Sequence, residues 1–315
     1  MAVFPDNRAL WAALHRTDPS SILVAEDRSC ASAVKAYGAG RYQLTINGAD
    51  QNGMPFDDFH VLIGLIPTLA ADDPEHGLAV GFGIGSTSHS MLAADRLERV
   101  SSVELCGGHY ELSGRLARRG VPEHRTLVED PRHVPLEGDG RRVLLASDER
   151  YDVVVPDTVR PNSGGSGNLY SLEFQRLVHD RLAHDGLTAG WLPTFRVLNA
   201  VSMTFPYVVV IRVPSYNDSA FYLAGHRPIA LDPATLLSRF DGLDDDALPA
   251  GQRAELRRFV SEMVPECVND GSVAPPAAPD LVNTDLRPRD EYFLHSGGIG
   301  EEQVTRTCRG PADRS

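Results

Sequence analysis

The sequence predicts an α/β fold, in which a parallel sheet carries helices on both faces and a small antiparallel β subdomain precedes it. Two observations predict this fold. Short apolar strands alternate with helical stretches through the middle of the chain, which favours a parallel sheet. Alternating apolar and polar runs near the N-terminus end in a hairpin signal. The 315 residues, 42% of them hydrophobic, can bury a substantial core without metals or disulfides.

The N-terminal subdomain is expected within residues 1–55. A lead-in helix and loop occupy the first 20 residues, and the apolar runs at 22–24 and 42–46 are typical of strands. The second run ends in Asn47-Gly48, a pair that favours a two-residue hairpin turn. These signals indicate a small antiparallel sheet before the main domain.

The main domain is expected to cover residues 56–295. Its parallel strands are predicted at 78–80, 100–105, 151–156 and 187–192. Helices are predicted at 59–69, ending near Pro67, and at 142–146 and 169–184. An antiparallel pair at 207–213 and 220–224 is expected to close the sheet, the acidic stretch 232–262 to be helical, and residues 296–315 to form a disordered tail.

The composition of the chain indicates which classes of partner to exclude and which cellular location to expect. The net charge of −13 and the pI near 5.3 argue against nucleic acid or an anionic membrane as a partner. The N-terminus shows no signal peptide and the chain no membrane-spanning apolar run, so we expect a cytoplasmic protein. Its four cysteines form no CxxC pair, which predicts reduced thiols and no metal site. They are Cys30, Cys106, Cys267 and Cys308.

A glycine-rich turn follows the first predicted parallel strand. Gly81, Gly83 and Gly85 alternate with Phe82 and Ile84, and a helix is expected to begin after them. Such a turn lets the backbone approach a ligand closely. The same spacing also fits a plain tight turn between a strand and a helix, so the glycines alone do not separate the two readings.

Three acids follow at positions that a nucleoside site would use. Glu104 ends the next strand, about 20 residues beyond the glycines, where an acid commonly binds ribose hydroxyls. Asp139, followed by Gly140, could accept a hydrogen bond from an adenine amino group. Asp157 ends the third strand, at the edge where open α/β sheets bind ligands. Each has an ordinary alternative: an exposed Glu, an Asp-Gly turn, or a loop cap.

With these elements in order, the sequence resembles the polyamine aminopropyltransferases, the spermidine synthase family, and especially its bacterial branch often fused to membrane transporters. The matching stretches are 42–51, 81–85, 103–105, 137–140, 151–157, 168–174, 190–193 and 283–292. The resemblance implies a Rossmann-like, class I S-adenosylmethionine-binding domain behind an N-terminal β subdomain. It also implies S-adenosylmethionine, or its decarboxylated form, as co-substrate.

The resemblance further implies roles for individual residues. Around the nucleoside it places Gln51, Glu104, Asp139 and Gly140. Asp157 matches the family's general base, and Tyr216, the second predicted catalytic residue, matches a tyrosine beside the acceptor amine. We add the glycines 81, 83 and 85 to the predicted donor site, and Phe59, His60 and Arg160 to the predicted acceptor site.

The sequence also departs from the family. Ile84 stands where the family usually has an Asp that grips the donor's aminopropyl ammonium, and Arg160 where a second Asp binds the polyamine. Phe59-His60 replaces Tyr-Gln, and Gly190 replaces Gln. Arg160 would repel a dication and suit a carboxylate, which intact S-adenosylmethionine carries. The alternative is that Ile84 and Arg160 face away from the site, Arg160 pointing to solvent, and that another acid, Asp57 or Asp58, takes over.

We therefore expect an enzyme that moves an alkyl chain, 3-amino-3-carboxypropyl or 3-aminopropyl, from a sulfonium donor to a small-molecule acceptor, releasing methylthioadenosine. Asp157 would take the nucleophile's proton. Methyl transfer from the same donor, classical spermidine synthesis and non-catalytic nucleoside binding are the alternatives. The sequence does not name the acceptor, and a homodimer is left open.

Overall fold

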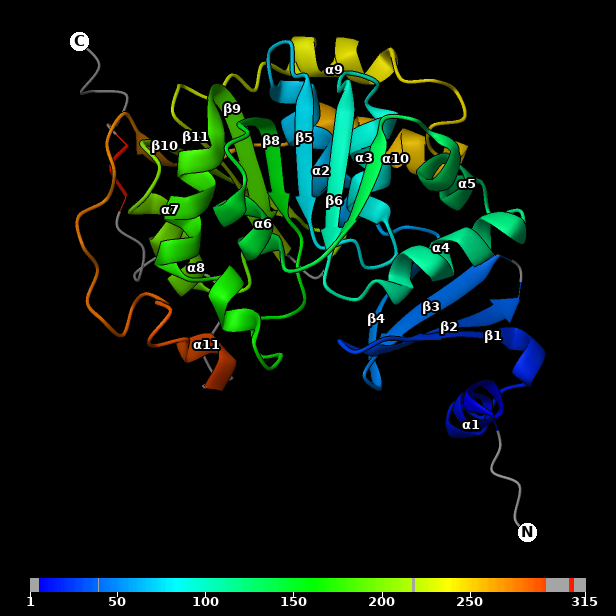
Figure 1. Ribbon diagram of the computed structural model, residues 1–315. Coiled ribbons are helices and arrows are strands. Elements are labelled where there is room, and N and C mark those ends of the chain that lie inside the picture. Colours follow the sequence, from blue (N-terminus) through cyan, green and yellow to red (C-terminus); the bar gives the residue numbers. More distant parts are fainter. Residues whose placement is uncertain (1–5, 39, 217–218, 293–305, 309–315) are drawn as a thin grey trace.

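The computed structural model describes residues 6–38, 40–216, 219–292 and 306–308 (Figure 1). After helix α1 (Asn7–Leu14) and the short turn η1 (Pro19–Ser21), four strands form an antiparallel meander. They are β1 (Ile22–Glu26), β2 (Ala31–Gly38), β3 (Arg41–Ile46) and β4 (Ala49–Met54). Asn47 and Gly48 join β3 to β4 with φ of 49° and 83°, as the predicted hairpin turn requires. The N-terminal β subdomain is thus confirmed.

The main sheet has eight strands in the order β12-β10-β11-β9-β8-β5-β6-β7. The parallel strands are β5 (His76–Val80), β6 (Arg99–Glu104), β7 (His133–Glu137), β8 (Tyr151–Pro156) and β9 (Leu182–Trp191). The antiparallel strands are β10 (Tyr207–Val213), β11 (Ser219–Gly225) and β12 (Glu266–Asp270). The parallel sheet and its closing antiparallel pair are as predicted, whereas β7 and β12 are additional.

Helices cover both faces of this sheet (Figure 1). One core cluster includes side chains of α2 (Asp58–Ala70), α3 (Ser86–Ala93), α4 (Gly108–Arg118), α5 (Pro122–Glu129), α9 (Pro233–Asp241) and α10 (Ala250–Glu262), and it extends to the N-terminal sheet. The other includes side chains of α6 (Gly140–Ala146), α7 (Leu172–Arg181) and α8 (Phe195–Ser202). The turn η2 (Ser166–Leu169) and the helix α11 (Arg289–Tyr292) lie outside the two layers. The predicted α/β architecture is therefore confirmed.

Two predicted helix ends were wrong. Helix α2 does not end near Pro67 but continues to Ala70, because it is buried over nearly its whole length. Arg96 and Arg239 donate hydrogen bonds to the carbonyl groups at its C-terminal end, which need partners outside the helix. The helix predicted at 169–184 covers only Leu172–Arg181, and the residues after it already pair with β8.

The prediction of reduced thiols was also wrong. Cys30 is bonded to Cys106, and Cys267 to Cys308, with Cα–Cα distances of 5.7 and 6.2 Å. The partners are separated by 76 and 41 residues, so local spacing carries no sign of either pair. The predicted disordered tail lies mostly outside the described residues. Its described part, 306–308, is joined to β12 by the second disulfide and by a Thr307–Val268 hydrogen bond.

No helix among the described residues is both long and apolar enough to cross a membrane.

Candidate active site

A cleft of about 700 Å³ opens between the N-terminal sheet and the carboxyl ends of β5, β6 and β8. Every site residue predicted from the sequence lines this cleft except Gly85. Gln51 lies on the β4 side, while the glycine turn and the three acids come from the main domain. The two parts of the chain therefore form the walls of one site.

The three glycines of the turn have different roles. A Cβ at Gly81 would lie 2.1 Å from the carbonyl oxygen of Asp157, so only glycine allows the ends of β5 and β8 to meet there. Gly83, with φ of 55°, has open space on its Cβ side and faces the cleft. Gly85 precedes α3 with φ of 98°, and a Cβ there would collide with Leu127. Gly85 thus serves packing, outside the predicted donor contact.

Glu104 holds the glycine turn in place. Its Oε2 accepts hydrogen bonds from the amides of Phe82 at 2.9 Å and Gly83 at 3.0 Å, and its Oε1 from the amide of Cys106 at 2.9 Å. Burial alone would raise the pKa of Glu104, but the neighbouring His109 ring and these amides lower it to about 2. A carboxylate that is ionised at neutral pH therefore stands at the predicted ribose position.

Asp139 and Gly140 start helix α6 at the cleft wall. Asp139 caps the helix by accepting hydrogen bonds from the amides of Arg141 and Arg142, as in the ordinary Asp-Gly reading. A Cβ at Gly140 would lie 2.3 Å from Val80 Cγ1, which explains the glycine by packing. Both residues still line the cleft, so the predicted adenine contact stays a prediction.

Asp157 belongs to a partly buried charged cluster that lines the cleft with His60. His60 lies between two carboxylates, with Nδ1 2.7 Å from Asp57 Oδ1 and Nε2 3.6 Å from Asp157 Oδ1. The second oxygen of Asp157 accepts a hydrogen bond from Thr87 Oγ1 at 2.5 Å. Thr87 therefore orients one oxygen of the predicted base, and His60 lies in ion-pair distance of the other.

The cluster shifts the pKa values of its members. Burial raises the pKa of Asp157, an effect that the His60 charge and the Thr87 hydrogen bond oppose. Burial would lower the pKa of His60, but the charges of Asp157 and Asp57 raise it to about 9. His60 is accordingly an imidazolium at neutral pH, and its charge favours the ionised form of Asp157.

Aromatic rings form the wall beside this cluster. Phe59 and Tyr216 stack with ring centroids 5.0 Å apart, and Tyr216 meets His60 edge-on at 6.0 Å. Burial and the charge of Asp57 raise the pKa of Tyr216, so its hydroxyl stays protonated. Arg160 is exposed on the loop after β8 and lines the same cleft. The predicted acceptor residues are therefore assembled in one region.

The sequence did not indicate two residues of this region as parts of a site. Thr87 lies in the first turn of α3, where a hydroxyl residue is ordinary. Trp191 lines the cleft at the end of β9, although we had noted it only within a matching stretch. Asp57 is recognisable as the N-cap of α2, but its contact with the His60 ring depends on the side-chain geometry. Local pattern offered no sign that Thr87 contacts Asp157.

Comparisons with known proteins give a consistent picture, although no protein-family model matches the chain. It is 28% identical over 257 residues to polyamine aminopropyltransferase 2 of Hyperthermus butylicus, covering 73% of this chain and 81% of that one. It is 31% identical over 148 residues to polyamine aminopropyltransferase 2 of Pseudomonas aeruginosa, covering 46% of this chain and 42% of that one. The second match thus spans less than half of either protein.

A solved structure shows a related fold. A spermidine synthase in complex with the transition state analogue AdoDATO superimposes with a TM-score of 0.61 and 18% identity, covering 76% of this chain and 84% of that one. At this identity the likeness concerns the fold. It confirms the class I, Rossmann-like architecture with an N-terminal β-sheet.

Proposed function

We propose that the chain, which is similar to the polyamine aminopropyltransferases, is a divergent spermidine synthase-like transferase that moves an alkyl chain from an S-adenosylmethionine-type sulfonium to a small-molecule amine. The observation that carries this proposal is the cleft itself. It joins a glycine turn, suited to a nucleoside, to the partly buried carboxylate of Asp157, suited to deprotonating a nucleophile.

The proposed reaction needs alignment and one proton transfer. The acceptor nitrogen forms a bond to the alkyl carbon, the carbon–sulfur bond breaks, and methylthioadenosine leaves as a neutral thioether. Asp157 receives the proton of the amine, with Thr87 orienting one of its oxygens and His60 in ion-pair distance of the other. The rings of Phe59 and Tyr216 form an apolar wall beside the reacting carbon.

We further propose intact S-adenosylmethionine as the preferred donor, with 3-amino-3-carboxypropyl as the transferred group. Ile84, 3% exposed, contributes an apolar surface to the cleft and cannot hold a donor ammonium. Arg160 can pair with a carboxylate. The imidazolium of His60 adds a second positive charge near Asp157, which disfavours a dicationic acceptor such as putrescine.

Aminopropyl transfer from the decarboxylated donor is the second candidate. The names of the relatives favour it, and so does the second carboxylate, Asp57, beside the predicted base. The two carboxylates of Asp57 and Asp157 carry one more charge than the single charge of His60 offsets, so they can still accept hydrogen bonds from an ammonium group.

Product analysis separates these candidates. The protein is incubated with each donor and with putrescine or an amino-acid-like acceptor, and products are identified by mass spectrometry. Methylthioadenosine from intact S-adenosylmethionine supports our proposal, while S-adenosylhomocysteine indicates methyl transfer. Efficient spermidine formation from the decarboxylated donor would overturn the donor assignment.

A charge reversal adds a quantitative test. Arg160→Asp should shift the ratio of kcat/KM for the two donors about tenfold toward the decarboxylated form, the scale of a lost charge-assisted contact. Arg125→Asp is the matched control, because Arg125 is exposed on α5 and lies outside the cleft lining. An equal shift in both variants would mean that Arg160 acts only through overall charge.

A further inference from the structure

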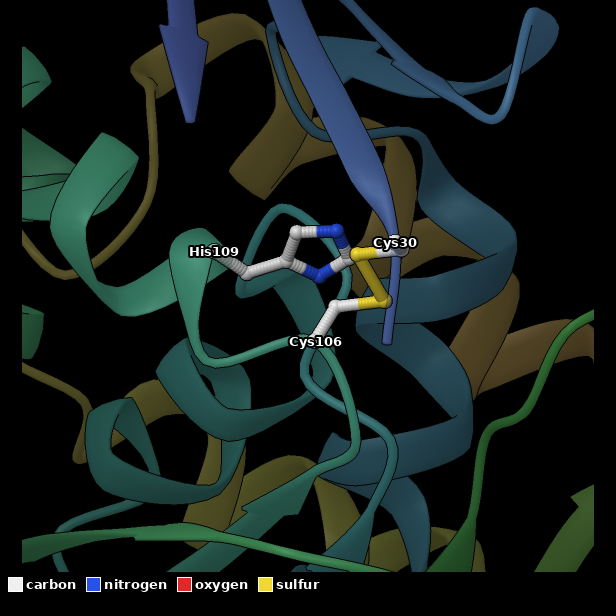
Figure 2. A group of neighbouring side chains, drawn as sticks. All are labelled: Cys30, Cys106 and His109. Carbon is white, nitrogen blue, oxygen red and sulfur yellow. A yellow bond between two sulfur atoms is a disulfide. The ribbon is translucent and has the colours of Figure 1, made fainter. Parts of the chain in front are cut away.

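A second group of reactive side chains lies at the rim of the cleft. Cys30 precedes β2, Cys106 follows β6, and His109 lies in the first turn of α4. Figure 2 shows the imidazole ring of His109 beside the disulfide that joins the two cysteines. One ring nitrogen and both sulfur atoms lie within 4.8 Å of one another. This group, Cys30, Cys106 and His109, is called the rim cluster below.

The rim cluster is buried, and one of its polar atoms has no partner. The two cysteines are each 7% exposed and His109 is 2% exposed. His109 Nε2 forms a hydrogen bond with Ser32 Oγ at 2.9 Å. The other ring nitrogen, Nδ1, has no hydrogen-bond partner, and the nearest charged group to it is the Glu104 carboxylate, whose Oε2 lies 3.3 Å away. Buried polar atoms without a partner are rare and call for an explanation.

We propose that Cys30, Cys106 and His109 bind a zinc ion when the disulfide is reduced. Two thiolates and one imidazole are a ligand set that zinc commonly takes, with a fourth position left for water. In the tautomer that zinc requires, Nε2–H of His109 donates to Ser32 Oγ, which fixes the ring and leaves the lone pair of Nδ1 for the metal, as outer-shell partners of metal-bound histidines do. Both cysteines also line the cleft, which provides a path for the ion and for water.

A dithiol or a phosphine can reduce the disulfide between Cys30 and Cys106. The reductant supplies two electrons, the sulfur–sulfur bond breaks, and each cysteine sulfur takes up one proton. A dithiol provides these protons and becomes a disulfide, whereas a phosphine takes the oxygen of a water molecule, whose two protons go to the cysteines, and becomes a phosphine oxide. Zinc then displaces these two protons and binds both thiolates, while neutral His109 contributes a lone pair. The nearby carboxylate of Glu104 favours a cation at this place, and two thiolates beside it without a metal would be costly.

The proposed ion would preserve a link that matters for the cleft. The disulfide ties the turn between β1 and β2 to the loop after β6, and Gly108 N donates to Asp27 Oδ2 across the same junction. The amide of Cys106 donates to Glu104, which holds the glycine turn. Zinc would therefore replace one cross-link by another beside the predicted donor site. The inference itself does not depend on the proposed transferase function.

The test uses the full chain carrying Cys267→Ser and Cys308→Ser, so that only the two cluster cysteines remain. After reduction by a phosphine and its removal without oxygen, thiols are counted and Co²⁺ is added as a spectroscopic probe. We expect one equivalent to bind with thiolate-to-cobalt absorption bands, and Zn²⁺ to displace it. In the same background Cys30→Ser should abolish the bands, and His109→Gln should weaken binding by about tenfold or more.

His124→Gln is the matched control. His124 is equally buried and also has a ring nitrogen without a partner, but it does not belong to the rim cluster. Cobalt binding should be unchanged in this variant. Because reduction removes a cross-link, the melting temperature of the reduced parent is measured as well. Zn²⁺ should raise the melting temperature of the reduced parent and leave that of Cys30→Ser unchanged. The proposal would be overturned if the reduced parent bound no more cobalt than Cys30→Ser, or if zinc stabilised it no more than that variant.

Discussion

The difference in stability between the wild type and the variant His60→Gln should depend on pH in a specific way. His60 lies between Asp57 and Asp157, and burial alone would lower its pKa, yet the two carboxylates raise it to about 9. Glutamine has a similar length and keeps hydrogen-bonding ability, but it carries no charge. The variant therefore removes the buried positive charge from the cluster while leaving both carboxylates in place.

The expected magnitude follows from the pKa shift. A histidine whose folded pKa exceeds its unfolded value of 6.5 contributes stability that is fully present below pH 6.5 and is lost as pH rises to 9. Each pKa unit corresponds to about 1.4 kcal/mol, so the contribution is at most about 3 kcal/mol. The difference in unfolding free energy between wild type and His60→Gln should thus shrink by up to that amount across this window.

Urea unfolding at steps from pH 6 to pH 9.5 measures the difference. His124→Gln serves as the control, because burial lowers the pKa of His124 to about 3 and the ring stays neutral in this range. Its difference from wild type should be independent of pH above pH 7. A pH-independent difference for His60→Gln would refute the reasoning, because it would mean that His60 is uncharged between the two carboxylates.

Three further predictions concern the cleft. Asp157→Asn should keep donor affinity within a few-fold by calorimetry and reduce turnover by roughly a hundredfold or more, and surviving turnover would place the base elsewhere. Glu104→Ala should weaken donor binding by about 1–3 kcal/mol, and unchanged affinity would contradict the nucleoside assignment. Gly81→Ala should lower the unfolding free energy by about 1–3 kcal/mol, because its Cβ would lie 2.1 Å from a backbone oxygen. Gly83→Ala should cost less, since open space surrounds it, and equal costs in urea unfolding would refute the contact.

Much of the fold could be predicted because its signals are local. The β3–β4 hairpin follows from Asn47-Gly48, whose backbone accepts positive φ. The strands β5 and β8 are buried, mostly apolar runs that end at the predicted residues, and β6 ends one residue before its predicted end. Strand β7 escaped prediction because it lies at the sheet edge, is half exposed and contains Pro135, so its pattern is weak. Strand β12, the opposite edge, is equally weak in pattern.

Those site residues that stand at strand ends could be predicted from the sequence. Parallel strands direct their carboxyl ends to one edge, so Gly81, Glu104 and Asp157 had to lie near one another. The side-chain contacts of Asp157 could not be predicted in this way. Its contacts with Thr87 and His60 depend on how α3 and α2 pack against β8, and a single histidine in a helix is usually structural.

The sequence by itself determined the α/β class, the hairpin subdomain, the glycine turn and the acids at the strand ends. Tertiary structure alone decided which distant groups meet. The disulfide between Cys30 and Cys106 closes 76 residues, and it exists because the turn after β1 packs on the start of α4, where His109 lies. The physical reason is that turn chemistry and burial periodicity act over a few residues. Contacts such as His60 with Asp157 arise only when whole helices and strands are packed together.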